Sequence, residues 1–111
     1  DGNRQERIYD VSVSDGREIG ADGRCRTPVG YTVSVVDATW SNAIGATELL
    51  DVWTDPDFVP DVPAFYSLRV VELPAPRWTA YDSKYFGVDL EDGDSGIHQE
   101  RAYTSPIWYT P

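Results

Sequence analysis

Short runs rich in Val, Thr, Tyr and Trp recur along this chain, and clusters of Gly, Pro and Asp separate them. Few segments have the apolar spacing of an amphipathic helix. β-branched and aromatic residues favour strands, whereas Gly, Pro and Asp favour the turns between strands. The pattern therefore predicts an all-β chain, and its 111 residues allow one domain with one hydrophobic core.

Five runs alternate apolar and polar residues, or are apolar throughout, and are predicted to be strands: 6–15, 31–40, 47–54, 64–73 and 101–109. The third should carry Leu50 and Val52 inward. The fourth, AFYSLRVVEL, is apolar on both faces, which predicts a strand in the middle of a sheet. The last should pack Tyr103, Ile107 and Trp108 across the core, and Pro106 within it requires an edge, a bulge or a strand start.

A short helix is predicted near 77–86, opened by Pro76 and capped by Gly87. Strands of this length, with one helical segment, predict an antiparallel immunoglobulin-like β-sandwich. Such a sandwich needs about seven strands, and the chain opens on Asp1-Gly2, a pair typical of hairpin turns. We therefore expect that a strand is missing at the N-terminus.

The chain carries 19 acidic and 9 basic residues, a formal net charge of -10. This charge repels phosphate backbones and anionic headgroups, so neither nucleic acid nor a membrane surface is an expected partner. Cys25 is the sole cysteine, which rules out a disulfide within the chain, and it is interpreted as an incidental small residue in a loop.

Few residues of this sequence are candidates for catalysis, metal binding or ligand binding. His98 is the single histidine, and no metal site or nucleophilic triad is predicted. The acidic stretch 89–100 resembles a calcium loop, but Asp94 occupies the position where an EF-hand requires glycine, so a solvated loop is favoured.

Trp residues can form a sugar-binding platform, although in a domain of this size they more often anchor cores and interfaces. Arg77 beside Trp78 could face a neighbouring surface, or its stem could pack over the indole.

Four stretches, ERIYDVSVSDGR (6–17), NAIGATELLDVWTDPDF (42–58), PRWTAYD (76–82) and ERAYTSPIWYTP (100–111), together carry a family resemblance. In this order and spacing they resemble the C-terminal region of large bacterial proteins of unknown function, which are related to the PHP-type (polymerase and histidinol phosphatase) metal-dependent phosphoesterases. The resemblance covers nearly the whole chain.

The resemblance implies that residues 1–111 are a non-catalytic C-terminal accessory domain of a larger metal-dependent hydrolase. The divalent metal would be held by an upstream catalytic domain, and none of its ligand motifs maps onto this chain. That upstream part of the polypeptide is the expected partner. From the residues themselves, we expect Arg77, Trp78 and Tyr81 to face it, because the proline-rich bend LPAP (73–76), after a central strand, projects the side chains that follow it beyond the sandwich. An extracytoplasmic location, periplasmic or secreted, is also implied. The alternative is a stand-alone binding module for carbohydrate or a protein partner.

Overall fold

The computed structural model describes residues 4–111. The described chain forms two compact units, the first from residues 4–30 and 44–54 and the second from residues 31–43 and 55–111. All the strands and the helix belong to the second unit.

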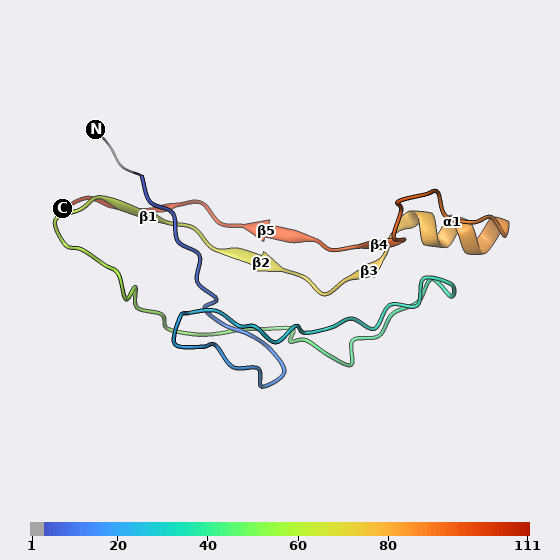
Figure 1. Cartoon of the computed structure of the whole chain (residues 1–111), viewed down its shortest axis with the longest axis horizontal. Helices are drawn as coiled ribbons and strands as arrows, with labels where there is room; N and C mark the ends of the chain where they lie inside the picture. The colour runs from blue at the N-terminus through green and yellow to red at the C-terminus, as the bar shows by residue number, and fades with distance from the viewer. Residues whose placement is uncertain (1–3) are drawn as a thin grey trace. The chain divides into compact units, whose positions relative to one another are not determined.

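The second unit contains six short strands that pair two by two. In chain order they are β1 (Ala64–Tyr66), β2 (Arg69–Val71), β3 (Ala75–Pro76), β4 (Ile97–His98), β5 (Arg101–Tyr103) and β6 (Ile107–Tyr109). β1 pairs with β6, β2 with β5 and β3 with β4, always antiparallel. Residues 64–76 and 97–109 therefore run side by side as one interrupted ribbon, with α1 (Trp78–Phe86) at its closed end (Figure 1).

Two prolines lie where the ribbon is interrupted. Three residues, 104–106, separate β5 from β6, but only two separate β1 from β2 on the opposite side. Three residues, 72–74, separate β2 from β3, but only two separate β4 from β5. Each side thus has one extra residue, and the longer linkers contain Pro106 and Pro74, which cannot donate to a ladder. The prediction that Pro106 requires an edge, a bulge or a strand start is confirmed.

Helix α1 ends as its sequence predicts. Gly87 has a φ of 67°, in the left-handed region, and its N–H donates to Ser83 O at 2.9 Å. Glycine reaches this conformation without the clash that a Cβ would cause, and it is the commonest residue that ends a helix in this way. The role predicted for Pro76 is wrong, because Pro76 belongs to β3 and Arg77 occupies the N-cap position.

Residues 31–40 form a tight hairpin and not the predicted strand. Ser34 N donates to Thr39 O at 2.8 Å and Thr39 N to Ser34 O at 3.1 Å. The reversal between them places Ala38 at a φ of 49°, and Ser34 Oγ donates to Asp37 Oδ2 at 2.8 Å. A Ser or Asp side chain that bonds near its own backbone stabilises a turn, and this competes with an extended strand.

The first unit has turns and extended backbone but no strand among its described residues. The chain turns at Asp15-Gly16, where both residues have positive φ, 59° and 62°. The strands predicted at 6–15 and 47–54 are wrong, because neither segment finds a continuous ladder partner. Asp10 N donates instead to the loop carbonyl of Gly23, at 2.8 Å.

The all-β prediction with one short helix is confirmed, but the immunoglobulin-like sandwich is not. Each sheet of the described chain has two strands, so residues 64–73 are not central in a larger sheet. Among residues 4–111 the buried hydrophobic side chains are Ala38 and Ala80, and the ring of Pro76 is buried as well. Side chains predicted to point inward are exposed: Leu50 90%, Val52 92%, Tyr103 67%, Ile107 73% and Trp108 71%.

Candidate functional site

The best-packed part of the second unit lies where α1 meets the end of the ribbon. Ala80 is fully buried there, and Gly96 faces it across the contact. A Cβ on Gly96 would lie 2.7 Å from Val35 Cγ1 and 2.9 Å from Leu90 Cδ1. Arg77 N donates to Gly96 O at 2.8 Å, which ties the start of the helix to the loop. This contact fixes which face of α1 is turned outward.

The outward face of α1 is aromatic. Trp78, Tyr81 and Tyr85 follow one another at spacings of three and four residues, so they share one side of the helix, while Ala80 lies on the opposite side. Their exposed fractions are 65%, 44% and 83%. These three residues are called the aromatic helix face below.

Two of the three predicted interface residues, Trp78 and Tyr81, belong to the aromatic helix face, and Tyr85 was missed. Helical spacing from Trp78 would have found Tyr85. Arg77 differs from them, because its Nη1 lies 3.6 Å from Asp94 Oδ1 and its backbone holds the helix start. Arg77 is therefore a structural contact of the loop as well as an exposed residue.

A shallow depression of about 580 Å³ lies beside this face, lined by Tyr81, Asp82, Lys84 and Tyr85. Lys84 Nζ is already engaged, since it donates to Asp37 O at 2.7 Å. The surroundings offer aromatic surface and few free polar groups. They suit contact with another apolar surface better than recognition of a polar small molecule.

A second exposed cluster lies on the ribbon. The rings of Phe65 and Trp108, paired across β1 and β6, are 5.2 Å apart at an interplanar angle of 40°. Further along, Arg69 is paired with Tyr103 and Val71 with Arg101 across β2 and β5. All six of these side chains on the ribbon are exposed to solvent.

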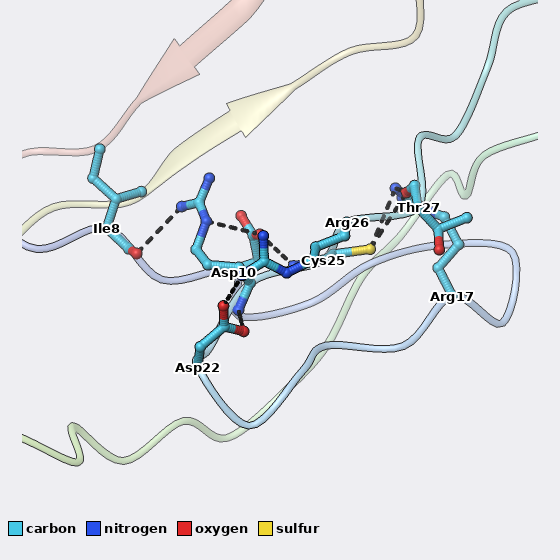
Figure 2. Close-up of polar contacts among 8 residues, drawn as sticks. Ile8, Asp10, Arg17, Asp22, Cys25, Arg26 and Thr27 are labelled. Atoms are coloured by element: carbon cyan, nitrogen blue, oxygen red, sulfur yellow. Dashed lines mark hydrogen bonds and ion pairs between the residues drawn. The ribbon is translucent and has the colours of Figure 1, made fainter.

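The first unit holds Cys25 within a polar loop (Figure 2). Asp10 Oδ2 accepts from Cys25 N at 2.7 Å and lies 3.5 Å from Arg24 Nε. Arg17 Nη1 donates to Thr27 O at 3.2 Å and lies 3.9 Å from Cys25 Sγ. Each polar group here bonds its own loop, so the arrangement stabilises the loop, and the interpretation of Cys25 as incidental stays a prediction.

Three carboxyl groups have pKa values below their usual range, each for a local reason. The N–H of Gly96 donates to Asp94 Oδ1 at 2.9 Å and lowers the Asp94 pKa, with Arg77 adding to the effect. The pKa of Asp15 is lowered by Ser14 and that of Asp22 by the N–H of Arg24. Hydrogen bonds to the charged form stabilise it. Asp22 and Asp94 each accept from a backbone N–H two residues ahead in a turn, whereas Asp15 accepts from the distant N–H of Gly45 at 2.8 Å.

No three His, Cys, Asp or Glu side chains of residues 4–111 converge in a group that could hold a metal ion. His98 Nε2 lies 2.9 Å from Glu100 Oε1, a pair of neighbours in the chain and not a catalytic cluster. The described residues also include no helix with the length and apolar character of a membrane span. The candidate binding surfaces of the described chain are therefore the exposed aromatic side chains of α1 and the exposed aromatic and arginine side chains of the ribbon.

Comparison with known proteins identifies a family for this chain. The family described as "Protein of unknown function (DUF3604)" matches residues 1–111. No curated protein and no solved structure matches the chain. The relationship to PHP-type enzymes therefore stays a prediction. Since the family match runs over the full 111 residues, the chain belongs to the DUF3604 family of proteins of unknown function.

Proposed function

We propose that this chain is a non-catalytic accessory region of a larger, PHP-like metal-dependent hydrolase of the phosphoesterase type. In this proposal it packs against an upstream catalytic domain of the same polypeptide, which binds the divalent metal and carries out the reaction in an extracytoplasmic compartment. The aromatic helix face, with Arg77 at its start, lies in the contact.

The observation that supports this most strongly is the exposure of all four tryptophans. Trp40 is 51% exposed, Trp53 36%, Trp78 65% and Trp108 71%. Tryptophan is highly buried on average in folded proteins, because its large ring loses much free energy when it stays in water. A chain that leaves all of its tryptophans in contact with solvent has surface that another body can cover.

The total surface leads to the same conclusion. The chain exposes 9255 Å². By the scaling of surface with mass, two separate compact bodies with the masses of the two units would together expose about 7,300 Å². The excess, about 2,000 Å², exceeds the roughly 800 Å² that one partner contributes to a standard interface and is in the range of obligate ones.

The ribbon supports the finer fold prediction as part of the same proposal. The outer edges of β1, β2, β5 and β6 have no partner strand among the described residues. An isolated two-stranded ribbon is at best marginally stable in water. We propose that upstream strands pair with these edges and complete an immunoglobulin-like sandwich.

Alanine variants of the aromatic helix face, made in the complete polypeptide, test the proposal. Trp78→Ala and Tyr85→Ala should each weaken docking by about 2 kcal/mol or more, as truncated interface aromatics do. Proteolytic cleavage within residues 1–111 should then be about thirtyfold faster, because cleavage follows the population of the open form. Tyr31→Ala is the control, since Tyr31 is 62% exposed but lies outside both α1 and the ribbon.

Equal cleavage rates in the wild type and in all three variants would contradict the proposal. So would an isolated chain that unfolds cooperatively and binds a glycan, which is what the alternative of a stand-alone carbohydrate-binding module predicts.

A further inference from the structure

One face of the ribbon combines cations with aromatic rings. Residues paired across antiparallel strands share a face, as do residues two apart on one strand. The pairs Arg69 with Tyr103 and Val71 with Arg101 therefore bring these four side chains to the same side of β2 and β5. They are called the arginine ribbon face below.

The two arginines of this face differ from the other basic residues of the described chain. Within residues 4–111, neither Arg69 nor Arg101 has an ion-pair or side-chain hydrogen-bond partner. The other seven basic residues all have an interaction, and Arg77 and Lys84 are examples that hold α1 in place. In a chain of net charge -10, two cations without a carboxylate partner are unexpected.

Their placement also has a cost. Arg69 and Arg101 are diagonal neighbours, which puts their Cα atoms about 7–8 Å apart. Like charges on neighbouring side chains repel, and neither guanidinium forms an ion pair with a carboxylate of the described residues. Carboxylates on an opposing surface would offset it, because the planar guanidinium group binds a carboxylate through two parallel hydrogen bonds.

We propose that the arginine ribbon face is the docking surface for an acidic patch on the upstream part of the same polypeptide, with one carboxylate of that patch bound by Arg69 and another by Arg101. This inference rests on the proposed function and adds the chemistry of the partner surface. Tyr103 and Val71 supply apolar contact between the two ion pairs, and arginine and tyrosine are among the residues that contribute most to interfaces.

Hydrogen exchange of β2 and β5 in the complete polypeptide tests this inference. In the double variant Arg69→Glu/Arg101→Glu, amide protection of both strands should fall about thirtyfold or more, since breaking a buried charge pair has an effect of this size. Arg69→Gln/Arg101→Gln, which removes the charges without adding repulsion, should lower protection less. Arg26→Glu is the matched control, because Arg26 is 80% exposed and pairs with Asp22 in the other unit.

A second measurement does not depend on how the variants fold. Raising the salt concentration should lower protection of β2 and β5 in the wild type, but by less than the charge-reversal variant does, because salt screens buried ion pairs less than exposed ones. Protection unaffected by salt and by both double variants would overturn the inference. So would a face that gains protection when inorganic phosphate is added and loses that gain in the Gln variant, since it would then be a phosphate site.

The outcomes separate the two proposals. If Trp78→Ala loosens the chain and the arginine variants do not, the accessory role stands and the acidic partner surface is wrong. If β2 and β5 are equally protected in the complete polypeptide and in residues 1–111 alone, the proposed function itself fails.

Discussion

Replacing Gly96 with alanine tests the contact that orients the aromatic helix face. Gly96 has a φ of 65° and is buried next to Ala80 of α1 and Val35 of the hairpin at residues 31–40. An alanine there would have to adopt a left-handed conformation, at a cost of about 1–2 kcal/mol. Its Cβ would also lie 2.7 Å from Val35 Cγ1 and 2.9 Å from Leu90 Cδ1, closer than real contacts allow. Overpacking of this kind costs about 1–3 kcal/mol.

Together these effects should destabilise the start of α1 by about 2–5 kcal/mol. Amide exchange of residues 78–86 in the complete polypeptide should accelerate by about 30-fold to 4,000-fold, up to the limit set by global unfolding. The readout is local, so it does not require two-state unfolding of a multidomain protein.

Gly87→Ala is the matched control for this variant. Gly87 has almost the same φ, 67°, but a Cβ there would meet nothing within 4 Å. Both variants should share the backbone cost, and only Gly96→Ala should add the cost of the clash. If the two variants accelerate exchange equally, Gly96 is not packed against Val35 and Leu90, and the reasoning that turns Trp78 and Tyr85 outward is wrong.

Two further predictions concern local contacts. Gly23→Ala should loosen the first unit and speed up chemical labelling of the Cys25 thiol, because Gly23 has a φ of 72° and its Cβ would lie 2.6 Å from Tyr9 Cδ1; an unchanged labelling rate would contradict this packing. The pKa of Asp94 is lowered in the folded state from its ordinary value of 3.8. As the pH falls below 3.8, unfolded chains therefore bind the proton before folded chains do. The stabilisation that Asp94 contributes is present above pH 3.8 and is lost as the pH falls through the lower pKa of the folded state. Asp94→Asn should reduce this pH dependence of α1 protection, and an identical pH profile in wild type and variant would refute the assignment.

Four strands and the end of the helix in the second half of the chain could be predicted because their signals are local. Gly87 ends α1 through its own backbone freedom, and Pro106 marks a bulge because it has no N–H to donate. Residues 64–66, 69–71, 101–103 and 107–109 are strands within the predicted runs. Each of these strands needs only one antiparallel partner strand, and the chain provides it.

The first half was predicted poorly because alternation alone does not make a strand. Residues 6–15 and 47–54 have the period of a half-buried strand, but no described segment pairs with them as a ladder. At residues 31–40 the Ser34–Asp37 turn competed with extension, and the Asp in that run was an overlooked turn signal. Inward side chains such as Leu50 could not be confirmed, because the described chain provides no core for them to enter.

The candidate site was found in part. Trp78 and Tyr81 were singled out because they follow the bend at Pro74 and Pro76, and both are exposed on α1. The arginine ribbon face could not be predicted, since it depends on the register of β2 against β5, which brings Arg69 and Arg101 to the same side. Register is a property of the paired strands and is weakly encoded in either one alone.

The central claim is that the exposed aromatic surface of this chain is covered by the rest of its polypeptide. Hydroxyl-radical footprinting, read residue by residue by mass spectrometry, measures this directly for Trp78, Tyr85 and Trp108. These three side chains should oxidise rapidly in the isolated 111 residues and should be protected in the complete polypeptide. Equal oxidation rates in the two samples would contradict the account.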